Sequence, residues 1–185
     1  MRYLFGFLLA IGLIILIIVL LFGGHSKQAQ LPANTKPLHD YADTSTTVSM
    51  TVDGPINADQ SHHQLKIIVD RYQVTYEQIT GYNGTVTSQQ TYHNTPAAYE
   101  NFLRSLEIVG FTQGNTDKVL ADERGHCPLA ERYVFVVDDG NKQLERFWTT
   151  SCGGTKTYGG NLTATETLFQ NQVPNYTDLT DNFTF

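Results

Sequence analysis

The chain has few basic residues, and its histidines lack the spacing of metal ligands. Lys and Arg together number 12 against 18 Asp and Glu, so the formal net charge at pH 7 is −6. A surface of that sign repels the phosphate backbone of nucleic acids. The 6 histidines are either consecutive or scattered, without the paired spacing that zinc sites use. We therefore expect no nucleic-acid partner, no metal and no cofactor.

Sequence motifs for phosphate binding and nucleophilic catalysis are also missing. Residues 154–161, GTKTYGGN, resemble a phosphate-binding loop, but Gly160-Asn161 stands where that motif has Lys-Ser or Lys-Thr. His126 precedes Cys127 and offers the one candidate pair of base and thiol. Side chains of neighbouring residues in an extended segment point to opposite faces, so His126 is poorly placed to serve Cys127. The sequence predicts no catalytic residue.

One long apolar run stands out at the start of the chain. Residues 4–22 contain only apolar side chains and glycine, and as a helix they would span about 28 Å at about 1.5 Å per residue. That length matches the hydrocarbon core of a bilayer. A cleaved signal peptide is the alternative, but its apolar region is usually shorter, about 7–15 residues, and Gly23-Gly24-His25 is no small-x-small cleavage site. We predict an uncleaved transmembrane anchor over residues 1–22, which contacts the membrane through residues 4–22.

Two further regions follow the predicted anchor. Residues 23–46 are rich in glycine, proline and polar side chains and show no apolar periodicity. This composition is typical of a flexible stalk. The folded domain is expected over residues 47–185.

Strands account for the first part of the predicted domain. Val48, Met50 and Val52 alternate with polar residues, which indicates a strand with one buried face. The apolar run 67–69 indicates a strand buried on both faces. A hairpin is predicted over residues 74–87 with a type I′ turn at Asn83-Gly84, and a second over residues 132–150 that turns at Gly140.

Two helices complete the predicted fold. Thr95 and Pro96 are typical of a helix start, and Gly110 of its end. Thr163 and Glu166 form a capping box that opens a second helix, which Pro174 stops. The fold class is therefore α+β: a small antiparallel β-sheet of two hairpins plus N-terminal strands, with two packed helices.

The two cysteines flank the second predicted hairpin. Cys127 and Cys152 are nearly equidistant from its turn at Gly140, so the two strand ends bring them together. We predict a disulfide bond between them. Disulfides persist mainly outside the cytosol, whereas the basic residues Arg2, Lys27 and Lys36 hardly discriminate the orientation. The predicted location is the cytoplasmic membrane, with the N-terminus inside and the C-terminal domain outside.

Aromatic side chains offer a candidate ligand surface. Trp148 and Tyr133 lie on the second hairpin, and Lys156 and Tyr158 follow it in a glycine-bounded loop. Aromatic residues on paired strands more often form core than a binding groove. These four residues are our candidates for a ligand surface, with core packing as the alternative for the aromatic ones.

Between about Ile67 and Tyr176 several short stretches match one group of proteins. The stretches are 81–84 GYNG, 98–99 AY, 102–103 FL, 110–112 GFT, 124–128 RGHCP, 132–135 RYVF, 148–154 WTTSCGG, 168–169 LF and 173–176 VPNY. In these the chain resembles uncharacterised single-pass membrane-anchored proteins of Saccharibacteria-type candidate-phylum bacteria. That resemblance implies no known activity. It implies that the four Asn-x-Thr sequences, at Asn83, Asn161, Asn175 and Asn182, carry no glycan.

The function expected from these features is binding. A stalk, a disulfide and the lack of a paired acid and base predict a noncatalytic interaction domain, whose partner is a protein or an envelope or cell-surface ligand. An accessory or inhibitory subunit of an envelope complex is the first alternative. A cell-envelope enzyme that uses Cys127 and His126 is the second.

Overall fold

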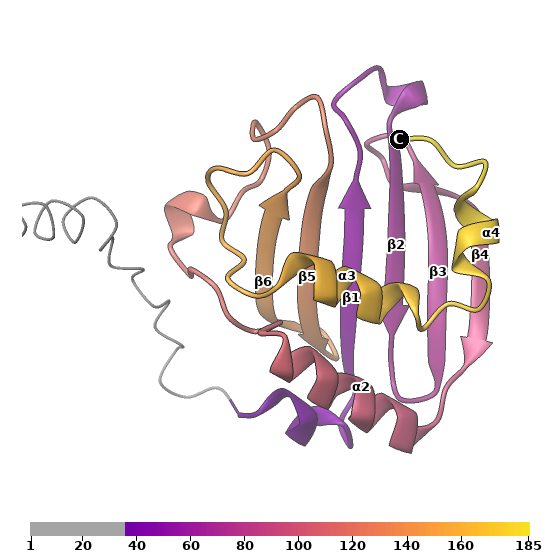
Figure 1. Ribbon diagram of the computed structural model, residues 1–185, viewed down its shortest axis with the longest axis vertical. Helices are drawn as coiled ribbons and strands as arrows, with labels where there is room; N and C mark the ends of the chain where they lie inside the picture. The colour runs from indigo at the N-terminus through magenta and orange to yellow at the C-terminus, as the bar shows by residue number, and fades with distance from the viewer. Residues whose placement is uncertain (1–35) are drawn as a thin grey trace, which may run out of the picture.

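The computed structural model describes residues 36–185, so the predicted anchor and residues 23–35 of the predicted stalk lie outside it. Within the described range, no helix combines the length and the hydropathy that a membrane crossing requires. The described residues form one antiparallel sheet with the α-helices on one face (Figure 1). The α+β fold class is confirmed.

The sheet has six strands in the order β4-β3-β2-β1-β5-β6. All neighbours pair antiparallel. The bounds are β1 Thr46–Asp53, β2 His63–Val69, β3 Gln73–Thr80, β4 Thr85–His93, β5 Arg132–Asp139 and β6 Lys142–Thr150. Both predicted hairpins are present, and the pairing of β1 with β5 joins them into one sheet.

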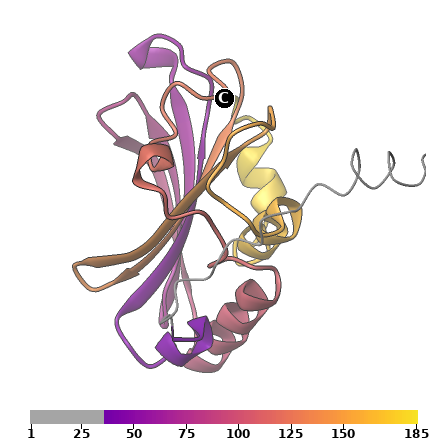
Figure 2. The same cartoon turned by 90° about the vertical axis from the view of Figure 1, so that its left-hand side faces the viewer.

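Helices α2 Pro96–Ile108 and α3 Leu162–Gln170 cover one face of the sheet (Figures 1 and 2). Their apolar side chains interdigitate with those of the strands. Phe169, for example, meets Phe102 and Phe111 with ring centroids 5.2 and 5.7 Å apart. A third helix, α4 Tyr176–Thr180, was not predicted. The fully buried members of this core include Met50, Leu65, Ile67, Tyr76, Tyr99, Leu103, Phe111, Phe135, Phe147 and Phe169.

The opposite face of the sheet is covered only at its β5–β6 side. There the segment 115–131, which contains the short helix η3 Lys118–Leu120, lies across the sheet from α2 and α3 (Figure 2). Adjacent residues of a strand point to opposite faces. Because Phe147 belongs to the helix-side core, Trp148 points toward the segment 115–131.

The turns confirm one detailed prediction and correct another. Gly140 has a φ of 60° between the paired residues Asp139 and Lys142, as the second hairpin requires. The first hairpin closes through residues 81–84, where Gly81 and Gly84 carry the positive φ angles. Among residues 36–185 only Cys127 and Asn175 are non-glycine residues with positive φ. The type I′ turn at Asn83-Gly84 was therefore wrong, because the loop is longer and uses two glycines.

The predicted capping residue is confirmed for one of the two long helices, α2, but not for α3. Thr95 caps α2, accepting a hydrogen bond from the Ala98 N–H at 3.2 Å. The cap of α3 is Asn161, whose Oδ1 accepts from the Ala164 N–H at 3.1 Å. The capping box at Thr163 was wrong because the cap lies two residues earlier, at Asn161, and the helix begins at Leu162. Strand β2 was also predicted to be buried on both faces, but Ile68 is only half-buried because no helix covers its face.

The folded domain begins before residue 47. A short helix, η1 Leu38–Tyr41, packs beside α2 and buries Leu38 in the core at 3% exposure. The His39 Nδ1 lies 2.6 Å from the Glu107 Oε2, and the Tyr99 hydroxyl donates to the Thr46 carbonyl at 2.7 Å. The predicted stalk therefore ends too late at residue 46. Because Leu38 is a single buried leucine among polar residues, it produces no periodic pattern from which η1 could have been predicted.

Candidate binding surface at the loop end of the sheet

Four loops meet at one end of the sheet, which we call the loop end. They are residues 54–62, 81–84, 125–131 and 151–156, and they lie at the top of Figure 1. Strand β1 runs from Thr46, beside η1, to Asp53 at the loop end. Its eight residues span about 25 Å at about 3.3 Å each. The loop end therefore lies far from the point where the described chain begins.

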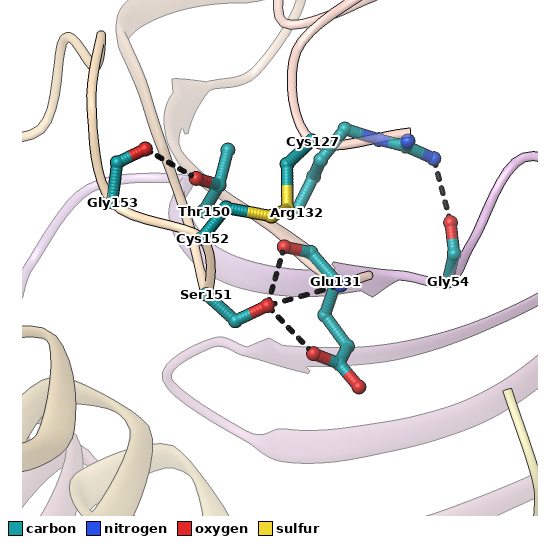
Figure 3. The surroundings of a disulfide bond; sticks show 8 residues. All are labelled: Gly54, Cys127, Glu131, Arg132, Thr150, Ser151, Cys152 and Gly153. Atoms are coloured by element: carbon teal, nitrogen blue, oxygen red, sulfur yellow. Dashed lines mark hydrogen bonds between the residues drawn. A yellow bond between two sulfur atoms is a disulfide. The ribbon is translucent and has the colours of Figure 1, made fainter. Parts of the chain in front are cut away.

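A disulfide between Cys127 and Cys152 joins two of these loops (Figure 3). The predicted bond is thereby confirmed, with Cα atoms 5.8 Å apart. The register of the hairpin differs slightly from the expected one, because it turns between Gly140 and Asn141 and bulges after Val137. Beside the disulfide, the Ser151 N–H donates to the Glu131 carbonyl at 3.0 Å. These contacts hold the segment 125–131 against the end of β6.

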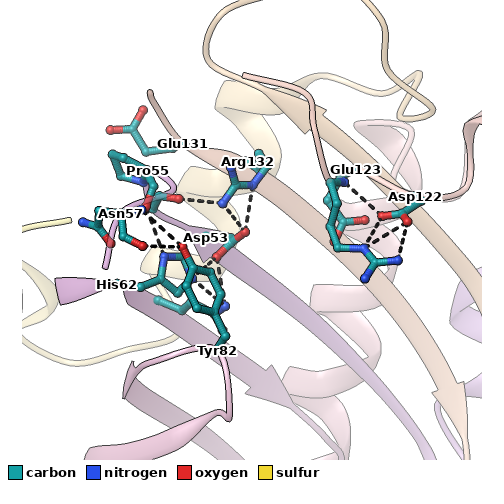
Figure 4. Close-up of polar contacts among 12 residues, drawn as sticks. Asp53, Pro55, Asn57, His62, Tyr82, Asp122, Glu123, Glu131 and Arg132 are labelled. Carbon is teal, nitrogen blue, oxygen red and sulfur yellow. Dashed lines mark hydrogen bonds and ion pairs between the residues drawn. The ribbon is translucent and has the colours of Figure 1, made fainter. Parts of the chain in front are cut away.

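A buried ionic network ties the other loops to the same place (Figure 4). The Asp53 carboxylate accepts from the Arg132 Nε at 2.8 Å and lies 2.9 Å from the His62 Nε2. Arg132 is only 2% exposed and His62 is fully buried. The second nitrogen of the His62 ring lies 3.1 Å from the Pro55 carbonyl, so both ring nitrogens face oxygen acceptors.

The same network fixes the loops 54–62 and 81–84. The Arg132 Nη2 donates to the Gly54 carbonyl at 2.7 Å. The Tyr82 ring stacks on the His62 ring with centroids 4.1 Å apart, and its hydroxyl donates to the Asn57 carbonyl at 2.9 Å. A buried ion pair is costly to break, since either partner alone would be left charged and buried. The network therefore holds these loops in one arrangement.

Apolar side chains project from three of the fixed loops. Ile56, Tyr82 and Leu129 are 44%, 53% and 85% exposed. The Ile56 N–H donates to the Pro128 carbonyl at 2.7 Å, which places the loops of Ile56 and Leu129 next to each other. Exposed apolar and aromatic side chains on rigid loops are typical of protein-binding surfaces. These three residues are the best candidates for contact with a partner.

The segment 115–131 buries the only tryptophan of the chain. The Trp148 Nε1 donates to the Leu120 carbonyl at 2.7 Å, and the His126 ring lies 4.8 Å from the indole. The Arg146 Nη2 lies 2.6 Å from the Glu123 carboxylate and holds the same segment. As a result Trp148 has no exposed surface. His126 packs on Trp148 while Cys127 is in the disulfide, which leaves no free thiol for the alternative nucleophile in this structure.

The four predicted ligand-surface residues do not form one surface. Trp148 is covered by the segment 115–131, and Tyr158 is 1% exposed on the helix side, with its hydroxyl 2.6 Å from the Thr165 Oγ1. Both assignments were wrong, because these side chains are core. Burial raises the pKa of the Tyr158 hydroxyl to about 12. Tyr133 is half-buried on the helix side, whereas Lys156 is exposed in the loop 151–156.

Half-buried acids also lie beside Tyr133. Burial raises the pKa of the Glu166 carboxyl above its usual value, and the negative charge of Glu131 adds to the effect. Burial, with the charge of Glu166, raises the pKa of Tyr133 to about 12. Within residues 36–185 no three His, Cys, Asp or Glu side chains are grouped to hold a metal ion.

A shallow apolar depression of about 530 Å³ lies elsewhere, between α2 and α3. Ile108, Val109, Ala164 and Leu168 contribute its apolar lining. Ile108 is 86% exposed, which is close to the 85% exposure of Leu129 at the loop end. It therefore offers a matched control for experiments on the loop end.

Sequence reasoning missed the residues that build the loop end. Asp53 and Arg132 are 79 positions apart, and His62 is one of two consecutive histidines without metal-ligand spacing. In the sequence, Asp53 follows one predicted strand and Arg132 begins another. Because the sequence does not give the order of the strands in the sheet, these positions do not show that the two residues pair.

The comparisons with known proteins add no family. No protein-family model matches the chain, and a search of curated proteins gave no match either. The resemblance to membrane-anchored proteins of Saccharibacteria-type bacteria therefore stays a prediction.

Proposed function

We propose that the chain is a single-pass membrane protein that displays a noncatalytic binding domain on the outer side of the cytoplasmic membrane. The apolar run 4–22 has the length of an anchor. The disulfide between Cys127 and Cys152 favours an oxidising compartment for the domain. The proposed orientation has the N-terminus inside and the domain outside.

The observation that carries the binding function is the position of the rigid loop end. The described chain begins at Lys36, beside η1, and the loop end lies at the other end of the sheet (Figure 1). An anchor attached at the η1 end leaves Ile56, Tyr82 and Leu129 free to meet a partner outside the membrane. Because these side chains are apolar and aromatic, the partner proposed for them is a protein on the envelope or on another cell.

Site-specific photocrosslinking in intact cells tests the binding surface. A benzophenone amino acid replaces Leu129 in one variant and Ile108 in the other, two positions that are 85% and 86% exposed. The expected result is a discrete adduct from position 129 that position 108 does not give. Identical adduct patterns from the two positions would contradict the proposal, since equal exposure would then explain both.

An anchor exchange separates this function from that of an accessory subunit held by its transmembrane helix. Residues 4–22 are replaced by an unrelated apolar segment of equal length, and the crosslinking from position 129 is repeated. A binding domain keeps its adduct after the exchange. Loss of the adduct, with the variant still in the membrane, would favour the accessory subunit.

A further inference from the structure

The two edges of the sheet differ in how they are protected. At the β6 edge, the N–H groups of Thr157 and Tyr158 donate to the Trp148 carbonyl at 3.0 and 2.8 Å. The Trp148 N–H in turn donates to the Thr157 Oγ1 at 2.8 Å. The remainder of β6 carries Lys142, Glu145 and Arg146. Cover and charge are the usual means by which a sheet edge avoids pairing with another strand.

Strand β4 has neither form of protection. Its sequence, TVTSQQTYH, contains no Lys, Arg, Asp, Glu, Pro or Gly. Only Ser88 and Tyr92 are half-buried, and the other residues are exposed. Within residues 36–185, β3 is the only strand that pairs with β4, so the backbone groups on its outer side have no strand partner. An exposed, uncharged edge of this length is a template for a further strand.

We infer that β4 pairs antiparallel with β4 of a second copy of this chain, which joins two sheets into one. A two-fold axis through the strand places identical surfaces against each other, so the edge must be complementary to itself. β4 meets this condition: a pair centred on Gln90 sets Gln89 opposite Thr91 and Ser88 opposite Tyr92. Such pairs can hydrogen-bond across the strands and contain no like charges.

Net charge favours this edge over the rest of the surface. The chain carries a net charge of −6, so like charges oppose the approach of two copies. β4 itself contributes no Asp, Glu, Lys or Arg to that repulsion. The bulge between Gln78 and Ile79 of β3 interrupts the regular pairing near the start of β4. The regular stretch from Ser88 to His93 is therefore the part that pairs.

The antiparallel arrangement leaves the loop end uncovered. Because the axis is perpendicular to the strands, the two loop ends point in opposite directions from the joint sheet. The two η1 ends point in opposite directions as well, so two copies anchored in one membrane pair with their strands along its surface and with the loop ends at the two sides. Self-pairing through β4 and binding at the loop end are tested separately. Either can fail without the other.

Thiol crosslinking of the full chain in its native membrane tests the pair. Q89C and Q90C place a thiol near the two-fold axis, and N101C places one on the exposed side of α2. A short bismaleimide reacts with these thiols but not with the disulfide-bonded Cys127 and Cys152. The expected result is a crosslinked dimer from Q89C or Q90C that is at least about threefold more abundant than that from N101C. Equal or lower yields from both β4 positions would overturn the inference, as would adducts only with a different protein.

A charge exchange tests the strand pairing directly. Gln89 is exposed and its Nε2 donates to the Glu77 Oε1 at 2.9 Å, so Q89K sets an opposite charge beside Glu77 and Q89E a like charge. The emission of the buried Trp148 verifies that both variants fold. Each variant is combined with Q90C. Either charge alone should lower the crosslinked fraction about threefold or more, and co-expression of the two should restore it. A crosslinked fraction that ignores these charges would contradict pairing through β4.

Discussion

Loss of the disulfide should destabilise the domain by an amount that loop closure predicts. Cys127 and Cys152 are 25 positions apart. In the chain-entropy description, closing a loop of that size in the unfolded state stabilises the fold by about 3.5 kcal/mol. The double variant C127A/C152A should lose about that free energy of unfolding. The contacts of Arg146 with Glu123 and of Trp148 with Leu120 form in the folded state with or without the bond. They should therefore preserve the fold.

Urea unfolding of the purified full chain in mild detergent measures this loss. Trp148 is the only tryptophan, and it is fully buried beneath the segment 115–131. Its emission therefore changes when this segment detaches and when the whole domain unfolds. At about 1–3 kcal/mol per M of urea, the midpoint should fall by about 1–3 M with little change in slope. Reduced wild-type chain is the matched control and should show the same midpoint as the double variant. A difference below about 1 kcal/mol would refute the reasoning, because the loop would then be equally restricted without the bond.

Three further substitutions test the packing and the charges. D53N leaves Arg132 buried without its carboxylate and should lower the free energy of unfolding by about 3–5 kcal/mol. The control D43N changes a carboxylate whose side chain is 88% exposed and should lower it by less than about 1 kcal/mol. Equal urea midpoints for the two variants would count against the network. G114A places a Cβ within 3.0 Å of the Phe147 ring and should cost about 1–3 kcal/mol, and an unchanged melting temperature would show that the ring moves freely. The raised pKa of Glu166 means that its contribution to stability is full below pH 4.5 and is lost as pH rises through the folded-state pKa. E166Q should therefore gain stability relative to wild type between pH 4 and pH 7, and a constant difference would contradict the assignment.

The hairpins and helices were predictable because their determinants are local. Gly140 at a turn between alternating strands and Thr95-Pro96 before an apolar stripe act within a few residues. The order of the strands was not predictable in the same way. β1 pairs with β5, and the paired residues are 79 or more positions apart in the sequence. No local pattern records that pairing, and η1 escaped for a similar reason, since Leu38 is its only buried residue.

The candidate site was less predictable than the fold. The disulfide could be predicted because both cysteines flank one hairpin. Core packing was the more common alternative for an aromatic residue such as Trp148, but the sequence did not decide between it and a groove. The segment 115–131, which buries Trp148, has no apolar periodicity that predicts its path. Ile56 and Leu129 are single apolar residues in polar loops, which in a sequence look like ordinary surface. Only the meeting of their loops gives them a candidate role.

The most direct test of the proposed display outside the membrane is labelling of intact cells with a membrane-impermeant maleimide, before and after reduction. The chain contains no cysteine other than Cys127 and Cys152, so mass analysis of those two residues reads topology and redox state together. The account predicts labelling of both only after reduction. Labelling without reduction would contradict the disulfide, and labelling only after lysis would place the domain in the cytoplasm and contradict the proposed orientation.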